Sequence, residues 1–225
     1  MDNLQATLVT FATKEFEKGQ LLLEEIAIRS GWNYASYNPT RLLQIDPLFN
    51  SRPVATIERG FGLWSWKPTI ILNELGELAE NQVLFYLDSG DLFLPNILDI
   101  YHNQLIGSPF LLFEGGGTIR EYTKRTVLNY FGFNGYLSRN KRMVEAGASF
   151  WRNTPASRKF LEKWKSACQV YELISDPTDD ELQHSNYISH RHDQSLLTLL
   201  GLQSGASIIR ASQRRSFQCN FSGGL

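Results

Sequence analysis

The chain has few cysteines, no long hydrophobic run and almost no net charge. Cys168 and Cys219 are its only cysteines and lack metal-ligand spacing, so we expect a reduced, cytoplasmic protein rather than a disulfide scaffold. The net charge of -1 gives no general attraction to nucleic acid. No apolar run approaches the ~20 residues of a membrane helix, and the N-terminus shows no signal-peptide pattern. We therefore expect no transmembrane segment and no nucleic-acid partner.

The chain does have enough apolar sequence for a sizeable core. It has 225 residues, 42% of them hydrophobic, which favours one domain over residues 1–225. Residues 8–12 predict a strand, and Thr13 predicts the start of a helix with Phe16, Leu23 and Ile26 on one face. A second strand over residues 32–37 completes a βαβ opening. This order is typical of a layered α/β fold.

Similar alternation continues to the end of the chain. Apolar runs predict strands over residues 83–87, 110–113, 147–151 and 206–209. Helices are predicted over residues 68–79, 95–105 and 196–200, after Thr123, and from Pro155 onward. The glycines at 115–117 lack the ending of a phosphate loop, so we interpret them as a flexible loop beside an acceptor site. Residues 171–189 are polar and aperiodic, which predicts a long loop.

The strand over residues 83–87 runs directly into the acidic sequence Asp88-Ser89-Gly90-Asp91. Five consecutive apolar residues indicate a central strand that is buried on both faces. Ligands bind beyond the carboxyl ends of such strands, and two carboxylates held close together favour a hard divalent cation that could bind a diphosphate. The alternative is an ordinary turn, in which Asp88 bonds its own backbone.

Two further segments carry candidate chemistry. Lys67 lies near a predicted helix N-terminus, where the helix dipole disfavours a cation, so it needs an anionic partner such as a phosphate. The sequence His190-Arg191-His192-Asp193-Gln194-Ser195 places two histidines and a carboxylate at a helix start, where they can ligate metals or transfer protons. The alternative for Asp193 is a helix cap.

These segments resemble small bacterial glycosyltransferases of the GT-A fold, which act on surface polysaccharide or lipopolysaccharide. The resemblance is carried by residues 8–13, the block Arg59-Gly60-Phe61-Gly62-Leu63-Trp64-Ser65-Trp66-Lys67-Pro68, the strand over 84–90, the His190 block and residues 147–153. It implies a single GT-A-like α/β domain with an open, twisted, mostly parallel sheet and helices on both faces. It also implies a hexosyltransferase-type enzyme that moves a sugar from a nucleotide-diphosphate donor to an acceptor hydroxyl.

The resemblance also implies roles for particular residues. Asp88 opens the position of the fold's Asp-x-Asp motif, but Gly90 occupies the third position and the second acid follows at Asp91. Three arrangements stay open: a metal on Asp88 and Asp91, Asp88 working with His192 or Asp193, or an enzyme without a tight metal. The implied metal ligands for Mn²⁺ or Mg²⁺ are Asp88, Asp91 and His192. The implied catalytic residues are Asp193, as the base of an inverting reaction, and Asp91. The implied nucleotide-sugar site comprises Thr10, Ala12, Thr13, Arg59, Gly60, Trp66, Lys67, Asp88 and Gly147.

The expected partners are a nucleotide-diphosphate sugar and a glycan or glycolipid acceptor, and the expected location is the cytoplasm, with the inner face of the membrane left open. Two other functions compete with this one. A catalytically degenerate nucleotide- or sugar-binding module would keep the fold and explain the irregular acidic motif. A sugar-phosphate nucleotidylyltransferase would need a glycine-rich, basic loop after the first strand, whereas the chain has Phe11-Ala12-Thr13-Lys14-Glu15 there.

Overall fold

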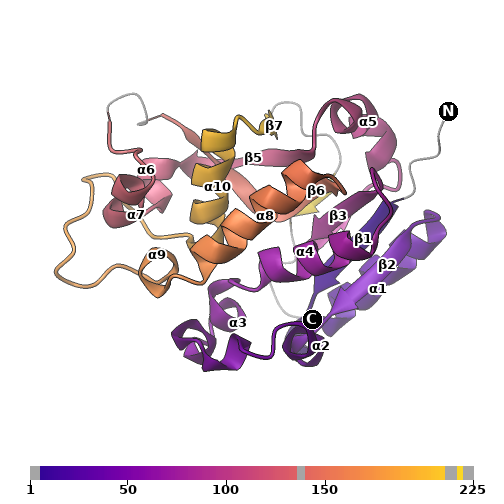
Figure 1. Cartoon of the computed structure of the whole chain (residues 1–225), viewed down its shortest axis with the longest axis horizontal. Helices are drawn as coiled ribbons and strands as arrows, with labels where there is room; N and C mark the ends of the chain where they lie inside the picture. The colour runs from indigo at the N-terminus through magenta and orange to yellow at the C-terminus, as the bar shows by residue number, and fades with distance from the viewer. Residues whose placement is uncertain (1–5, 136–139, 211–216, 220–225) are drawn as a thin grey trace.

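The chain folds around one six-stranded sheet that is surrounded by helices (Figure 1). The structure is a computed structural model that describes residues 6–135, 140–210 and 217–219. The strand order is β2-β1-β3-β6-β5-β7, so β3 lies in the interior of the sheet. The predicted α/β fold with a mostly parallel sheet is confirmed. The strands are β1 Ala6–Phe11, β2 Asn33–Tyr37, β3 Val83–Leu87, β5 Phe110–Thr118, β6 Arg142–Arg152 and β7 Ser207–Ile209.

Strand directions decide which loops meet at each edge of the sheet. β1 is parallel to both β2 and β3, and β5 is parallel to β7. β6 is antiparallel to β3 and to β5. The middle of β6 therefore passes the carboxyl end of β3, where Leu87 pairs with Ala148. This register brings β6 beside the acidic turn that follows β3.

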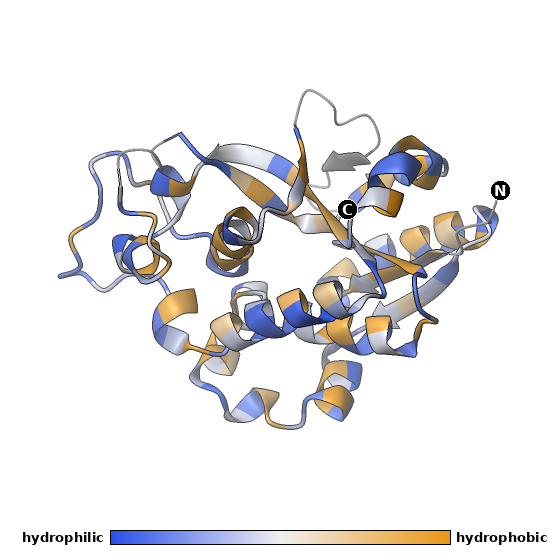
Figure 2. Ribbon diagram, turned by 45° about the horizontal axis from the view of Figure 1, so that its top comes forward, coloured by the Kyte–Doolittle hydropathy of each residue, from blue (hydrophilic) through white to orange (hydrophobic). Residues whose placement is uncertain are grey.

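Alternation along β3 feeds two hydrophobic cores, one on each face of the sheet. Leu84 and Tyr86 pack with residues of α4, α8 and α10, while Val83, Phe85 and Leu87 pack with residues of α1 and α5. In Figure 2 the central strands are largely hydrophobic, and the surrounding helices mix hydrophobic and hydrophilic residues. The sheet is therefore covered by helices on both faces, as the sequence predicts. These helices are α1 Glu17–Arg29, α4 Lys67–Glu77, α5 Ile97–Gly107, α8 Pro155–Cys168 and α10 His192–Ser204.

Short elements complete the fold and contribute to the loops beside the sheet. No helix in the described ranges is long and apolar enough to cross a membrane. The small strand β4, which begins at Asp91, pairs with a strand near the end of the chain. The remaining elements are η1 Lys14–Phe16, α2 Pro39–Ile45, η2 Phe49–Ser51, η3 Pro53–Thr56, α3 Gly60–Leu63, β4 Asp91–Phe93, α6 Ile119–Tyr122, α7 Arg125–Tyr130, α9 Tyr171–Ile174 and β8 Phe217–Cys219.

Three sequence-based expectations are wrong. The glycines at 115–117 are not a loop, because β5 continues through them to Thr118 and pairs with β6 across register shifts. Helix α10 begins at His192 rather than at residue 196, so Asp193 lies inside its first turn. Phe16 is 54% exposed, because it ends a short 3-10 turn before α1 instead of joining the buried face of that helix.

Candidate active site

The site forms where the carboxyl end of β3 meets β6. The amide N–H of Asp88 donates to the carbonyl of Gly147 at 2.8 Å, and the amide of Asp91 donates to the carbonyl of Asp88 at 3.0 Å. A Cβ atom on Gly147 would lie 3.1 Å from Oδ2 of Asp88 and 3.2 Å from Oδ2 of Asp91. Both carboxylates therefore converge on the bare Cα of Gly147, and a side chain there would require them to shift by a few tenths of an ångström.

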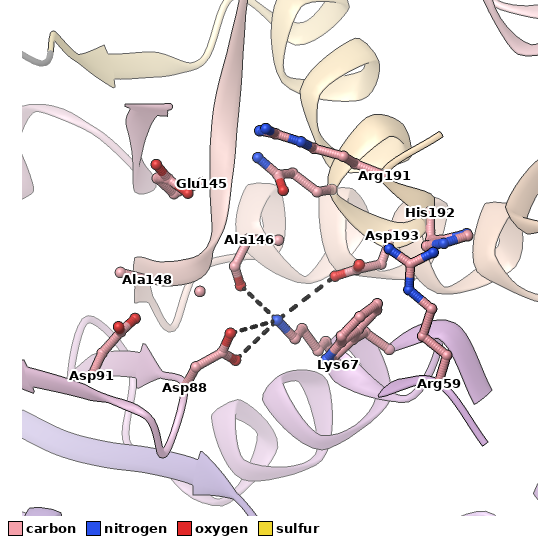
Figure 3. A pocket seen from close by; sticks show the side chains of 13 residues that line it. Arg59, Lys67, Asp88, Asp91, Glu145, Ala146, Ala148, Arg191, His192 and Asp193 are labelled. Atoms are coloured by element: carbon pink, nitrogen blue, oxygen red, sulfur yellow. Dashed lines mark hydrogen bonds and ion pairs between the residues drawn. The ribbon is translucent and has the colours of Figure 1, made fainter. Parts of the chain in front are cut away.

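Lys67 lies at the centre of the site, and its ammonium group bridges several elements (Figure 3). Its Nζ is 2.9 Å from Oδ1 and 3.1 Å from Oδ2 of Asp88, and it donates to the carbonyl of Ala146 at 3.2 Å. Oδ2 of Asp193 lies 3.8 Å away. The side chain is only 3% exposed. Lys67 therefore ties β3 to β6 and α10 from the start of α4.

The anions around Lys67 keep it protonated. Burial by itself would lower the pKa of Lys67, but the nearby carboxylates of Asp88, Asp193 and Asp91 outweigh it and raise this pKa above its usual value. A buried charge of this kind is stable only when it is paired and hydrogen-bonded.

Tyr86 makes a second contact to the same carboxylate. Its hydroxyl donates to Oδ1 of Asp88 at 2.5 Å, and its ring is fully buried in β3. Burial, followed by the charge of Asp88, raises the pKa of Tyr86 well above its usual value, so the phenol stays a donor. Residues two apart share a face of a strand, which is the sequence signal that could have placed Tyr86 beside Asp88.

Asp193 projects from the first turn of α10 toward Lys67. Its side chain is almost fully buried, and no hydrogen bond to its Oδ2 atom is found among the described residues. Burial, helped by the negative charge of Asp88, raises the pKa of Asp193 to about 7. The positive charge of Lys67 opposes this shift but does not cancel it. A carboxylate with a pKa near neutrality can accept and release a proton under physiological conditions. Asp193 therefore has the electrostatics of a general base.

The two histidines are turned away from the carboxylates. Nε2 of His190 donates to the carbonyl of Leu173 at 2.9 Å, and Nδ1 of His192 donates to the carbonyl of Ile174 at 2.8 Å. His192 also has a positive φ of 45°. No group of three His, Cys, Asp or Glu side chains in the described part of the chain has the arrangement of a metal site. The structure thus does not place the His192 ring as a metal ligand beside Asp88 and Asp91, because the ring is hydrogen-bonded to the last residue of α9.

A left-handed turn borders the site on the other side. The five residues Gly60-Phe61-Gly62-Leu63-Trp64 all have positive φ, between 50° and 84°. Each non-glycine residue in this conformation costs roughly 1–2 kcal/mol, so the surrounding packing must hold the turn. Trp66, just beyond it, stacks on Phe11 at a ring distance of 3.8 Å and donates from Nε1 to the carbonyl of Gly60 at 3.0 Å.

Two cavities meet at these residues, and we name them the outer and the inner cavity. The outer cavity has a volume of about 980 Å³ and the inner cavity about 410 Å³, both within the range of small-molecule sites. Trp64, Asp88 and Asp91 line both cavities. The outer cavity is lined by Phe11, Thr13, Lys14, Glu15, Phe16, Pro39, Glu58, Gly60, Phe61, Trp64, Trp66, Asp88, Ser89, Gly90 and Asp91. The inner cavity is lined by Arg59, Trp64, Lys67, Asp88, Asp91, Glu145, Ala146, Gly147, Ala148, Arg191, His192, Asp193 and Gln194.

Most sequence-predicted site residues line one of the two cavities, but two do not. Thr10 and Ala12 are 0% and 2% exposed and line neither cavity. Their neighbours Phe11 and Thr13 line the outer cavity instead. Sequence reasoning missed Tyr86, Glu145 and Arg191, which belong to this site or contact it.

No protein-family model matches the chain, and no curated protein matches it. Solved structures do resemble it. A crystal structure of the galactosyltransferase LgtC, in complex with donor and acceptor sugar analogs, has a TM-score of 0.50 at 12% identity, covering 91% of this chain and 73% of that one.

Two other solved structures resemble the chain slightly less. A glycosyltransferase involved in the glycosylation of the major capsid of PBCV-1 has a TM-score of 0.49 at 14% identity, covering 92% of this chain and 81% of that one. Mouse xyloside xylosyltransferase 1 has a TM-score of 0.48 at 8% identity, covering 92% and 84%. Identities this low compare the fold rather than the chemistry. The chain therefore shares its fold, a GT-A-like α/β fold, with the galactosyltransferase LgtC.

Proposed function

We propose that this protein is a glycosyltransferase that moves a sugar from a nucleotide-diphosphate donor to an acceptor hydroxyl. The observation that carries the proposal is the pair of cavities that share Trp64, Asp88 and Asp91. A donor has a nucleoside and a sugar joined by a diphosphate. The outer cavity suits the nucleoside, and the shared carboxylates suit the diphosphate with its cation. The inner cavity suits the donor sugar together with the part of the acceptor that attacks it.

The outer cavity has the surfaces that a nucleoside needs. Phe61, Trp64 and Trp66 provide aromatic surface, on which a base can stack. Lys14, Glu15 and Glu58 add charged groups at its lining, which can bind base edges or ribose hydroxyls. The likeness to LgtC, whose structure holds donor and acceptor sugar analogs, supports a donor site and an acceptor site here.

The two carboxylates at Gly147 fit a divalent cation such as Mn²⁺ or Mg²⁺. Such a cation binds one or two carboxylates and takes further ligands from water and substrate phosphates, so Asp88 and Asp91 suffice without His192. When bound, it would neutralise charge on the diphosphate. Both oxygens of Asp88 lie within reach of Lys67, so Lys67 holds this carboxylate, which would be a ligand of the cation, in one orientation.

The residues of the inner cavity support the chemistry of transfer. The acceptor hydroxyl oxygen forms a bond to the anomeric carbon, the bond from that carbon to the diphosphate oxygen breaks, and the electron pair leaves with the diphosphate. Asp193, whose pKa is raised to about 7 by burial, takes the hydroxyl proton if the configuration inverts. Arg59 lines the same cavity and can offset the charge that grows on the leaving group. Lys67 contacts the protein's own carboxylates, so we assign it a positioning role rather than a direct phosphate contact.

The biological setting belongs to the same proposal. The bacterial surface-glycan enzymes that the sequence resembles use glycan or glycolipid acceptors, so we propose a role in polysaccharide or lipopolysaccharide synthesis, in the cytoplasm or at the inner face of the membrane. The roles proposed for the residues of the inner cavity are the same for a glycan and for a glycolipid acceptor.

A second candidate function is a nucleotide-sugar-binding module without turnover. One observation favours it: Lys67 and Tyr86 already hold the carboxylate of Asp88, which lowers the gain from binding a metal there. Slow hydrolysis of the donor separates the two functions, because a transferase with water in its acceptor site releases nucleoside diphosphate and a pure binder does not.

The first experiment is a thermal-shift panel of UDP, GDP, CDP and dTDP, each with and without manganese. A ligand that binds only the folded state at about 100 times its Kd adds roughly 2.7 kcal/mol to the free energy of unfolding. We expect a metal-dependent shift for one nucleotide, and release of that nucleotide from its sugar conjugate. Shifts without release would favour the binding module, and a folded protein that no nucleotide shifts would contradict both functions.

Asp88→Asn is the matching variant. We expect it to abolish donor turnover and the metal-dependent part of the shift. Because it removes the partner of buried Lys67, we also expect a loss of on the order of 1–3 kcal/mol in the free energy of unfolding. Turnover that survives in Asp88→Asn would show that the diphosphate is bound elsewhere.

A further inference from the structure

Arg191 is held rigidly at the inner cavity by two contacts. Its Cζ lies 3.5 Å from the centroid of the Tyr122 ring, and its Nη1 donates to the carbonyl of Gly116 at 3.0 Å. Stacking of a planar guanidinium on an aromatic ring fixes its plane and leaves its edge available. The side chain of Arg191 is thus already ordered in the free protein, so binding a ligand there costs little additional conformational entropy.

The guanidinium of Arg191 has no anionic partner within the described residues. One N–H donor bonds Gly116, which leaves most of its donors unused. Glu145 lines the same cavity, but no ion pair joins it to Arg191. A Cβ atom on Gly116 would meet nothing within 4 Å, so there is open space beside the carbonyl that Arg191 contacts.

Arg191 also lies where an acceptor must come. In Figure 3 the guanidinium of Arg191 and the carboxylate of Asp88 lie at opposite ends of the drawn lining, and Asp193 lies at an intermediate height to one side of them. The donor diphosphate belongs at Asp88 and Asp91, and the acceptor hydroxyl must reach Asp193. A group bound by Arg191 therefore belongs to the acceptor and lies on the side of it that faces away from the diphosphate.

We propose that Arg191 binds a negatively charged group, a carboxylate or a phosphate, of the acceptor, so that the acceptor substrate is an anionic sugar. The proposal rests on the proposed function. Arginine matches both anions with parallel, charge-assisted hydrogen bonds, and a prearranged guanidinium discriminates strongly against a neutral analogue that leaves it unpaired.

The test uses pairs of acceptors that differ only in charge. With the donor identified by its hydrolysis, the release of nucleoside diphosphate is measured against concentration of methyl glucoside and methyl glucuronide, and of glucose and glucose 6-phosphate. We expect the anionic member of at least one pair to accelerate release with a KM about tenfold lower than its neutral partner. The pair that responds tells carboxylate from phosphate.

Arg191→Met tests the residue itself, because methionine keeps apolar contact with Tyr122 but has no charge. We expect about a tenfold rise in the KM of the anionic acceptor and no change in the KM of the neutral one. Arg29→Gln is the control, because Arg29 is an exposed arginine on α1 that pairs with Glu25, and it should change none of these values.

Several outcomes would overturn the proposal. Equal KM values within every pair, or no acceleration by any member, would remove the anionic acceptor while donor hydrolysis still supports the transferase. An equal loss with neutral and anionic acceptors in Arg191→Met would make Arg191 a structural residue. A rise only in the KM of the donor would place the anion on the donor sugar. Absence of donor hydrolysis would reject the proposed function and this inference with it.

Discussion

The proposed role of Asp193 as general base predicts how the rate depends on pH. Burial raises the pKa of this carboxyl to about 7, and a general base works only when it is ionised. The rate of transfer should therefore rise as the pH increases through about 7 and level off above it. Lys67 has a raised pKa and stays charged over this range. Donor turnover measured from pH 5 to 9 checks the profile, and a rate that falls with pH would exclude Asp193 as the base.

The same shift makes stability depend on pH. A carboxyl whose pKa is higher in the folded protein stabilises the fold below its unfolded pKa of about 3.8, and this contribution is lost as the pH rises through about 7. The asparagine in Asp193→Asn cannot ionise. The melting temperature of this variant should therefore rise relative to that of the unmodified protein as the pH increases from 5 to 8. A difference that stays constant over this interval would mean that Asp193 is ionised throughout.

At the scale of single residues, the sequence predicted which charged groups gather at the candidate site better than it predicted their contacts. Asp88, Asp91 and Asp193 could be chosen because a strand end and a helix start mark positions where ligands bind. The pairing of Lys67 with Asp88 could not, because it joins residues 21 positions apart in different elements. Arg191 was missed because its role depends on stacking over Tyr122, a tertiary contact without a local pattern.

The left-handed turn of residues 60–64 is an element whose glycines can be tested. Gly60 has a φ of +60°, and a Cβ atom there would collide with the Trp64 ring, whereas Gly31 has a φ of +73° with nothing within 4 Å. Both substitutions to alanine should cost roughly 1 kcal/mol from the backbone alone. Gly60→Ala should cost more and weaken nucleotide binding, because it displaces Trp64 from both cavities.

Gly31→Ala is the control, since it carries the same backbone strain on the surface. Melting temperatures and nucleotide affinities of the two variants are the measurement. Equal affinities would show that Trp64 does not contribute to the donor site, whatever the stabilities are.

Helix α1 positions the acidic turn through a second glycine. Alanine in place of a glycine inside a helix usually adds about 0.5–1 kcal/mol of stability, and Gly76→Ala in α4 should do so because nothing lies within 4 Å of its Cβ position. In α1, a Cβ atom on Gly19 would collide with the carbonyl oxygen of Ser89. Gly19→Ala should therefore lose stability and turnover together, as the turn carrying Asp88 moves.

Thermal unfolding and donor hydrolysis of this matched pair decide the point. If Gly19→Ala gained stability as Gly76→Ala does, the helix and the turn would not be in firm contact.

At the element scale, strands were predicted well because buried apolar runs have a strong local signal. The run at 83–87 matches β3 in full. The glycines at 115–117 broke that signal, yet pairing with β6 carries the strand across them to Thr118. The start of α10 was predicted too late, because His192 enters the helix with a positive φ that no sequence rule anticipates.

At the scale of the whole molecule, the site joins segments from most of the chain. Its residues come from α4, β3, β6 and α10, and the two cavities adjoin residues from position 11 to position 194. The fold was predictable because the order of elements restricts the topology. The antiparallel insertion of β6 between β3 and β5 was not, and it is this strand that brings Gly147 to the acidic turn.

A cavity away from the proposed site can serve as an internal control for ligand binding. A third cavity of about 370 Å³ is lined by Phe110, Lys159, Lys163 and neighbouring residues. It lies where β5 begins and β6 ends, since Phe110 pairs with Trp151. The acidic turn lies beside the middle of β6, at the carboxyl end of β3, so a ligand in the proposed site should leave this cavity unaffected.

Hydrogen exchange with mass spectrometry tests this arrangement in one experiment. The nucleoside diphosphate that passes the thermal-shift panel, added with manganese, should slow exchange in residues 11–16, 58–66 and 88–91, because it bridges the outer cavity and the shared carboxylates. An anionic acceptor added to that complex should extend protection to residues 116–122 and 190–194, where Arg191 and Asp193 lie. Residues 156–163 and 200–207, around the third cavity, should not change.

Nucleotide protection that appears around the third cavity instead would place the donor away from the acidic turn and contradict the two-cavity site. Protection of residues 190–194 by the nucleotide alone would mean that the donor extends to the position we assign to the acceptor.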